Sequence, residues 1–179
     1  MPIEIVRADI TTLRVDAIVN AANAALRGGG GVDGAIHAAA GPALLRELQR
    51  WPGCEPGDAV RTAGHRLPAR WVIHAVGPVW RGGGAGEAAV LRRAYASAFA
   101  RAREAGDVRT IAFPAISTGI YAYPRSEAAA IALDVMRAHA RDYDRVIACL
   151  FDAASVAVYE AALASVESGG GAPPPSALG

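Results

Sequence analysis

Hydrophobic and polar positions along the chain follow two spacings, one typical of buried strands and one typical of amphipathic helices. The clearest helix spans residues 87–104, where apolar side chains between Val90 and Phe99 recur at helical spacing. Further helices are expected over residues 33–49, interrupted near Gly41, and over residues 125–140 and 155–166. Short apolar runs predict strands over residues 3–7, 16–20, 60–65, 71–76, 109–113 and 145–151.

Strands that alternate with helices predict right-handed βαβ units, and therefore an α/β fold with a largely parallel sheet covered on both faces. We expect that the first strand could pair antiparallel with its neighbour in the sheet. The length of 179 residues suits one domain, expected over residues 1–167. From Ser168 onward the segment SGGGAPPPSALG has little apolar content, which predicts a disordered tail over residues 168–179.

The composition excludes several classes of protein. A net charge of +1 leaves no broad basic surface, so strong nucleic-acid binding is not expected. The chain has no Lys, which excludes both a P-loop and a Schiff-base mechanism. The two cysteines form no CxxC pair and the four histidines show no metal spacing, so we expect no disulfide framework, no metal and no cofactor.

The same pattern bears on location and assembly. The chain shows no apolar signal-peptide core near its start and no apolar run that approaches the roughly 20 residues of a membrane span. We therefore expect a cytoplasmic protein that does not act at a membrane. A monomer is the default expectation.

A polar and glycine-rich segment follows the second predicted strand. Asn20 and Asn23 are the two asparagines of the chain and lie three residues apart at the end of this strand. They either serve a ligand or adopt the turn conformations that asparagine favours. Glycines 28–31 follow, and a backbone without Cβ atoms can approach a ligand and point its N–H groups at an anion. The start of the next helix would add its dipole, although a glycine run alone also fits a plain flexible loop.

Asp33 is the one carboxylate in this segment. It can orient a water molecule or bind a ribose hydroxyl, or it can simply be a favourable charge at a helix N-terminus. The segment also contains G-x-G-x-x-G from Gly29 to Gly34, but residues 21–27 separate the first glycine of the run, Gly28, from the strand that ends at Asn20. A Rossmann fingerprint needs its glycine turn directly after the strand, so we reject this interpretation.

A second loop, residues 113–124, also joins a predicted strand to a predicted helix. Ser117, Thr118 and Gly119 offer hydroxyl and backbone donors to a phosphate, and Tyr121 could pack against a sugar. Alone, this loop fits an ordinary connection that buries Tyr121. In an open α/β sheet, however, both loops lie at the carboxyl ends of strands, where ligands bind, so together they predict a diphosphate site.

Two residues outside these loops bear on the site. Asp9 follows the first predicted strand, and its carboxylate can accept a hydrogen bond from an exocyclic amine such as that of adenine, or it can cap the following turn. His74 lies within a predicted strand and is interpreted as a structural residue. No histidine is assigned a catalytic role.

At these segments the sequence resembles the macrodomain family, in particular its MacroD-like branch, which includes bacterial O-acetyl-ADP-ribose deacetylases and mono-ADP-ribosyl hydrolases. The resemblance extends roughly from Ile3 to Val166. Two positions depart from the pattern of this branch: Ala122, where glycine is common, and Ala38, where a basic residue is common. The motifs that carry the resemblance are Ala8–Thr11, Val19–Asn23, Gly28–His37, His74–Pro78 and Pro114–Tyr121.

The resemblance implies a three-layer α/β/α sandwich with a mixed, mainly parallel sheet and a site for ADP-ribose. It implies that Asp9 holds the adenine amine and that Ile10 and Phe151 border the adenine. It further implies that Asn23 and Asp33 are catalytic residues beside the distal ribose and that Asn20 supports the same loop. The ligand-binding residues that it implies are Asp9, Ile10, Asn20, Gly30, Gly31, Val32, Ser117, Thr118, Gly119, Ile120, Tyr121 and Phe151.

The expected reaction is hydrolysis of an ester at the distal ribose, in O-acetyl-ADP-ribose or in proteins mono-ADP-ribosylated on Asp or Glu. An ester needs a positioned water and a stabilised oxyanion, for which a diphosphate oxygen, Asp33 and Asn23 are the candidates. One alternative is a reader module that binds ADP-ribose without turnover; the segment from Asn23 to Asp33 favours the enzyme. Another is an RNA- or poly(ADP-ribose)-binding module, which the near-neutral charge disfavours.

Overall fold

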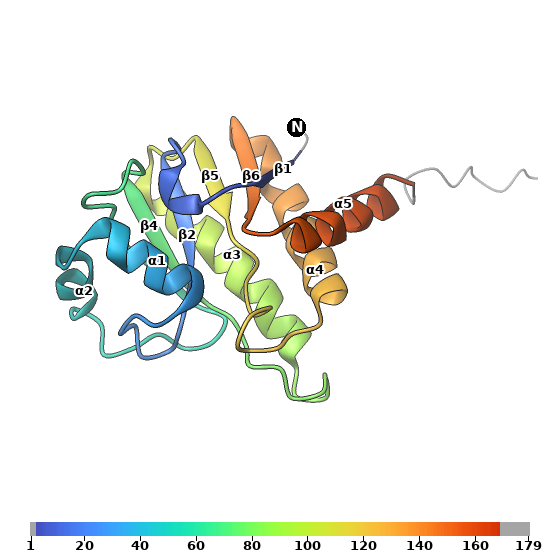
Figure 1. Ribbon diagram of the computed structural model, residues 1–179, viewed down its shortest axis with the longest axis horizontal. Coiled ribbons are helices and arrows are strands. Elements are labelled where there is room, and N and C mark those ends of the chain that lie inside the picture. Colours follow the sequence, from blue (N-terminus) through green and yellow to red (C-terminus); the bar gives the residue numbers. More distant parts are fainter. Residues whose placement is uncertain (1–2, 169–179) are drawn as a thin grey trace, which may run out of the picture.

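The computed structural model describes residues 3–168 of the chain (Figure 1). The strands are β1 (Glu4–Arg7), β2 (Ala17–Ala22), β3 (Ala59–Ala63), β4 (Trp71–Val76), β5 (Thr110–Phe113) and β6 (Arg145–Leu150). The helices are α1 (Gly31–Ala40), α2 (Ala43–Leu48), α3 (Glu87–Ala105), α4 (Arg125–His139) and α5 (Ala153–Ser168), with short 3-10 turns η1 (Ile10–Thr12) and η2 (Ala140–Asp142). Ser168 thus ends α5, and the rest of the expected tail lies outside the described residues.

The six strands form one mixed sheet in the order β1-β6-β5-β2-β4-β3. All neighbouring pairs are parallel except β3 and β4. The expectation that the first strand could pair antiparallel is wrong, because β1 runs parallel to β6. The antiparallel strand is β3, since residues 64–70, which join it to β4, are too few for the crossover that parallel strands need.

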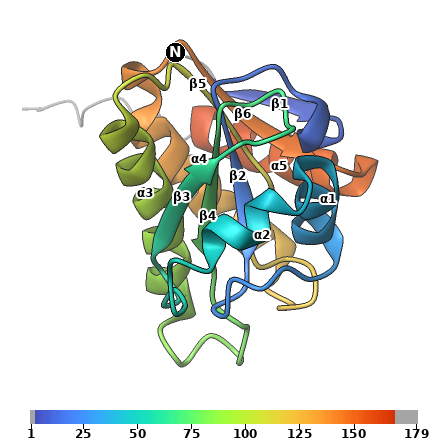
Figure 2. The same cartoon turned by 90° about the vertical axis from the view of Figure 1, so that its left-hand side faces the viewer.

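Helices cover both faces of the sheet and make three layers. Figure 2 shows α3 on one side of the sheet and α1 and α2 on the other. The α3 face buries Tyr95 and Phe99 with residues of α4 and α5, whereas the α1 face buries Ile36 and Leu44 against Ile18 of the sheet. Strand residues point alternately to the two faces, so β2 sends Val19 to one cluster and Ile18 to the other. The fold is therefore the predicted α/β sandwich.

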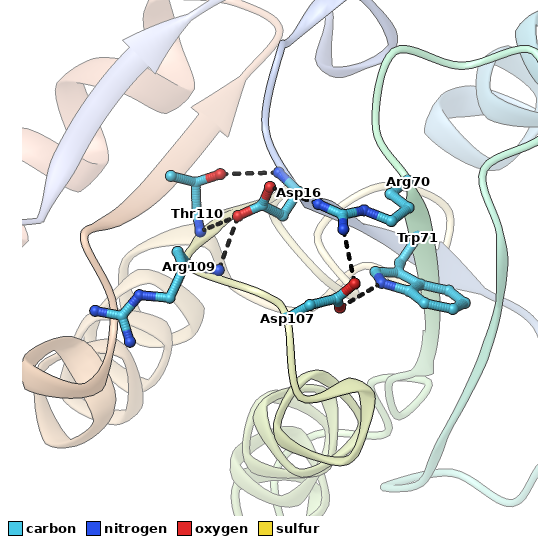
Figure 3. Close-up of polar contacts among 6 residues, drawn as sticks. All are labelled: Asp16, Arg70, Trp71, Asp107, Arg109 and Thr110. Atoms are coloured by element: carbon cyan, nitrogen blue, oxygen red, sulfur yellow. Dashed lines mark hydrogen bonds and ion pairs between the residues drawn. The ribbon is translucent and has the colours of Figure 1, made fainter.

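A polar cluster stabilises the amino ends of the central strands (Figure 3). The Asp16 carboxylate, just before β2, accepts hydrogen bonds from the backbone N–H groups of Arg109 and Thr110 at 2.8 and 2.9 Å. Arg70 donates to both Asp16 and Asp107, which ties the start of β4 to the same point. Although partial burial raises the pKa of Asp16, these hydrogen bonds outweigh it and hold the pKa below its ordinary value.

Replacement of Asp16 by Ala should lower the free energy of unfolding by about 1–3 kcal/mol, because two backbone donors lose their acceptor. Because the folded-state pKa is depressed, the contribution of the carboxylate is present above its ordinary pKa and disappears as the pH falls through the lowered value. Urea unfolding of the wild type and the variant between pH 2 and pH 7 would measure both effects.

The matched control is Asp134→Ala, which removes an exposed ion pair between α4 and Arg92 of α3. An exposed pair of this kind contributes less than about 1 kcal/mol, so this variant should stay close to the wild type. Equal losses of stability in the two variants would contradict the role assigned to Asp16.

Candidate functional site

A cavity of about 800 Å³ opens at the carboxyl ends of the parallel strands. Its wall includes residues that end or directly follow β1, β2, β4, β5 and β6, so five separate strands contribute to one site. Backbone and small side chains form much of this wall. Concave sites at this edge of an α/β sheet are where ligands bind.

The first side of the cavity is the loop between β2 and α1. Within it the Asn23 side-chain amide donates to the carbonyl of Gly28 at 2.8 Å and thereby closes the loop on itself. Gly31, with φ of +58°, adopts a left-handed conformation as the first residue of α1. The first bond into the helix runs from Gly34 N to Gly30 O, so the N–H groups of the preceding turn have no partner within the helix. Gly31, Val32 and Asp33, which carry N–H groups of this turn, line the cavity, and a helix N-terminus placed in this way can bind an anion.

The second side of the cavity is the loop between β5 and α4. Ser117 adopts a φ of +68°, and its carbonyl accepts the N–H of Tyr123 at 2.9 Å, which turns the chain back. The Tyr95 hydroxyl of α3 accepts the N–H of Ile116 at 3.1 Å and anchors the loop from below. The Ser117 hydroxyl is buried and has no partner among the described residues, although it lies at the cavity wall. A buried hydroxyl of this kind is available to a ligand.

Gly77, directly after β4, permits this arrangement. A Cβ atom at Gly77 would overlap Ser117 Oγ and lie 2.5 Å from Ile116 Cγ2. Only glycine therefore allows the second loop to pack so closely on the end of β4. Gly34 has the same function for the first loop, since a Cβ atom there would lie 2.5 Å from the carbonyl of Gly29.

Asp33 lies in the first turn of α1 and is 6% exposed. Its Oδ1 accepts a hydrogen bond from the Asn20 amide at 2.8 Å. The Nε2 atom of His37 lies 3.3 Å from the same oxygen but lacks hydrogen-bond geometry. A Cβ atom at Gly29 would lie 3.4 Å from Asp33 Oδ2 and 3.6 Å from the Asn23 amide nitrogen, so these two polar ends converge on one spot of the cavity wall.

Asp9 lies on the cavity wall near the end of β6. Its Oδ1 accepts the N–H of Thr11 at 3.0 Å and the hydroxyl of Thr11 at 2.7 Å, so it caps the η1 turn. Among the described residues, no donor is bonded to Oδ2. Phe151, 83% exposed, and the buried Ile10 line the cavity as well and could border a flat apolar group.

The structure brings the predicted site residues together with one exception. Asn20 is fully buried beneath the loop and is absent from the cavity wall, so it does not fit the expectation that it binds the ligand. It instead donates to Asp33 from below. The predicted residues that line the cavity are Asp9, Ile10, Asn23, Gly30, Gly31, Val32, Asp33, Ser117, Thr118, Gly119, Ile120, Tyr121 and Phe151.

Arg125 is the most informative residue that the sequence analysis missed. It lies at the start of α4, is exposed, and lines the cavity together with three carboxylates, those of Asp9, Asp33 and Asp152. An arginine at a helix end resembles any solvated surface residue in sequence, so no local signal marks it. Because the carboxylates outnumber this cation, an anionic ligand must be held largely by backbone N–H groups.

Ala122, which stands where glycine is common in the family, lies in a turn of the second loop. Its φ is +60°, a conformation in which glycine is favoured and alanine is strained. The loop nevertheless keeps its turn, because the N–H of Ala122 donates to the carbonyl of Gly119 at 2.9 Å. Alanine at this position therefore adds strain to a turn that the loop nevertheless adopts.

Within residues 3–168, no three His, Cys, Asp or Glu side chains gather as a metal site requires. In the same part of the chain, no helix is both long and apolar enough to cross a membrane.

The comparisons with known proteins agree with this geometry. The family model described as Macro domain matches residues 19–132. The Macro domain-containing protein RSc0334 of Ralstonia nicotianae is 57% identical over 88% of this chain and 91% of its own length. An O-acetyl-ADP-ribose deacetylase of Klebsiella pneumoniae is 53% identical over 90% of this chain and 96% of its own.

A solved structure is similar as well. The Trypanosoma brucei macrodomain in complex with ADP-ribose superposes with a TM-score of 0.80 and 42% identity, over 89% of this chain and 68% of that one. The family model spans more than half of the chain, and the relatives cover nearly all of it. The chain therefore belongs to the Macro domain family.

Proposed function

We propose that the chain binds ADP-ribose in the cavity and hydrolyses an ester at the distal ribose. The observation that carries this proposal is the meeting of two bare-backbone loops over one cavity that has Asp33 in its wall. The proposal draws support from the relatives named O-acetyl-ADP-ribose deacetylase and from the solved relative that holds ADP-ribose.

The diphosphate is assigned to the space between the two loops. The N–H groups at the start of α1 supply one set of donors, and the dipole of this helix favours negative charge there. The Ser117 hydroxyl, which bonds to no other residue that the structure describes, and the N–H groups of the residues after it supply the other set. The adenine is assigned to the end of the cavity with Asp9, whose Oδ2, bonded to no donor of the described residues, would accept a hydrogen bond from the exocyclic amine.

Hydrolysis then takes place at the ribose end, beside Asp33 and Asn23. A water molecule attacks the acyl carbon, the bond between this carbon and the ribose oxygen breaks, and the proton lost by the water ends on the ribose oxygen. Asp33 orients the water and a diphosphate oxygen assists its deprotonation, so the bound substrate takes part in its own cleavage. The products are a carboxylic acid and free ADP-ribose.

The same chemistry applies to two kinds of substrate. O-acetyl-ADP-ribose carries a small acyl group, and a protein modified on Asp or Glu carries the same ester bond to a larger partner. The cavity opens to solvent beside the exposed side chain of Ile120, 97% exposed, so we extend the proposal to mono-ADP-ribosylated proteins.

Replacement of Asp33 by Asn should reduce ester turnover by roughly 10²-fold, because the carboxylate that orients the water is lost. Affinity for ADP-ribose should change little, since the phosphate and adenine contacts remain. Release of acetate from O-acetyl-ADP-ribose and calorimetry with ADP-ribose would measure the two properties separately. Wild-type protein that binds ADP-ribose but cleaves neither this ester nor an Asp- or Glu-linked one would be a reader, and the enzymatic proposal would fail.

Replacement of Asp9 by Asn tests adenine recognition while the cap of the η1 turn is kept. Asn keeps an oxygen that can accept from Thr11, but it puts an N–H donor where the adenine amine would donate. Affinity for ADP-ribose should fall by about 1–3 kcal/mol, or roughly 5- to 150-fold in Kd, with little change in stability.

The control for Asp9 is Thr11→Val, which removes one capping bond and leaves the Asp9 carboxylate in place. This variant should lose stability and keep its affinity. If Asp9→Asn binds ADP-ribose as tightly as the wild type, the adenine lies elsewhere in the cavity.

Replacement of Arg125 by Gln tests how much of the affinity comes from charge. Because Arg125 is exposed, its attraction to a diphosphate is screened and should contribute only about 0.2–1 kcal/mol, a loss of affinity of roughly 1.4- to fivefold. Arg137→Gln, at the far end of α4, serves as the control and should bind as the wild type does. A loss well above tenfold would show that the cation, and not the backbone, dominates phosphate binding.

A further inference from the structure

Asp33 is the last member of a row of four buried polar side chains. The Asn20 amide nitrogen of β2 lies 2.8 Å from Asp33 Oδ1 and 3.1 Å from His74 Nδ1 of β4. The other ring nitrogen of His74 lies 3.0 Å from the hydroxyl of Thr62 on β3. Thr62, His74 and Asn20 are at most 1% exposed, and none of them lines the cavity.

The register of the sheet places these side chains next to one another. Asn20 and His74 are direct partners in the parallel pairing of β2 with β4, and Val60, two residues before Thr62, is the partner of His74 in β3. All three side chains point to the α1 face, where their neighbours Ile18, Val60 and Val72 form an apolar cluster. Polar groups in such surroundings are costly unless they satisfy one another, so this row must keep its hydrogen bonds.

The donors and acceptors of the row have one consistent assignment. The Asn20 amide has two hydrogens, one for Asp33 and one for His74 Nδ1, which must then be the acceptor. The imidazole proton therefore lies on Nε2 and is donated to Thr62, whose own hydroxyl donates to the carbonyl of Ala63 at 3.1 Å. Burial, with a smaller effect of nearby His37, lowers the pKa of His74 to about 3 and keeps the ring neutral.

The opposite orientation of the Asn20 amide is strongly disfavoured. It would put the carbonyl oxygen of Asn20 against a carboxylate oxygen of Asp33, two acceptors at hydrogen-bond distance. The orientation in which Asn20 donates to both Asp33 and His74 avoids this repulsion, and the acceptor at His74 Nδ1 stabilises it. It leaves Asn20 Oδ1 buried and without a partner among the described residues. A protein keeps such a buried unpaired oxygen where another requirement outweighs it.

We propose that Thr62 and His74 are positioning residues that act through Asn20 to hold the Asp33 carboxylate in its catalytic orientation. The inference rests on the proposed function of Asp33. With Oδ1 bonded to Asn20, Oδ2 is left on the side of Asn23 and the cavity, where the water is to be oriented. The edge strand β3, which contributes no residue to the cavity wall, thereby affects turnover.

The test is Thr62→Val, which keeps the shape of the side chain and removes the acceptor of the His74 proton. The rate of O-acetyl-ADP-ribose hydrolysis at saturation should fall roughly five- to tenfold, the effect of one lost buried hydrogen bond, while KM and the affinity for ADP-ribose stay unchanged. Thr62→Ser keeps the hydroxyl and should restore turnover.

Thr110→Val is the matched control. Thr110 also uses its hydroxyl inside the sheet, as the acceptor of the Asp16 N–H at 2.8 Å, but at the end opposite the cavity. Both valine variants should lose stability to a similar extent, and only Thr62→Val should lose turnover. Equal turnover in the two variants would overturn the proposal and leave Thr62 with a structural role alone.

A spectroscopic readout separates this inference from the proposed function. Nitrogen NMR of the histidine rings should show His74 neutral and protonated on Nε2 between pH 5 and pH 8, with an Nδ1 resonance that moves in Asp33→Asn. If the wild type cleaves no ester, the proposed function fails and these spectra still decide whether the row couples His74 to Asp33. A proton on Nδ1, or an Nδ1 chemical shift that is the same in the wild type and in Asp33→Asn, would overturn the inference.

Discussion

The parallel pairing of β2 with both β4 and β5 is the constraint on which the site depends. Because these strands run in the same direction, the residues that follow each of them emerge at one edge of the sheet. The loop after β2, Gly77 after β4 and the loop after β5 are therefore neighbours, although the sequence separates them widely. The Asp16 cluster keeps the opposite ends of the same strands together. The cavity is thus a direct consequence of strand direction.

Many anion-binding sites use cationic side chains, whereas this cavity offers an anion mainly backbone N–H groups. Asp9, Asp33 and Asp152 repel an anionic ligand, and Arg125 offsets them only in part. A site of this charge discriminates by geometry, since a phosphate is attracted only where N–H groups converge on it. The glycines that allow such close approach are Gly34 and Gly77, where even one extra carbon collides with its surroundings. Under the proposed function, the carboxylates elsewhere in the wall are the groups that recognise the base and take part in catalysis.

The sequence alone predicts much of the fold, because periodicity reports burial directly. The strand over residues 71–76 and the start of the helix at Glu87 match the structure, whereas α1 begins at Gly31, before the expected start at Asp33. Strand pairing cannot be inferred from local sequence, which is why the first strand was expected to be able to pair antiparallel. The antiparallel strand is instead β3, because its connection to β4 is short. The motifs also located both loops of the cavity.

The sequence could not predict which polar side chains line the cavity and which are buried beneath it. Asn20 and Asn23 share one motif, yet the first lies beneath the site and the second lines it, because Asn20 lies within β2 with its side chain buried on the α1 face, whereas Asn23 follows the strand in the loop. His74 was interpreted as structural, and it is indeed buried, but its connection to Asp33 appears only when the strand register is known. Arg125 carries no sequence signal at all, since its position beside the cavity depends on the path of the second loop.

The central claim is that the two loops hold one diphosphate between them. The most direct measurement is a titration of isotopically labelled protein with ADP-ribose, followed through the backbone amide resonances of Gly31 and Val32 in the first loop and of Ser117 to Ile120 in the second. The account predicts that both sets move together and saturate at the same ligand concentration. Movement confined to one loop, or binding that leaves both sets unmoved, would contradict it.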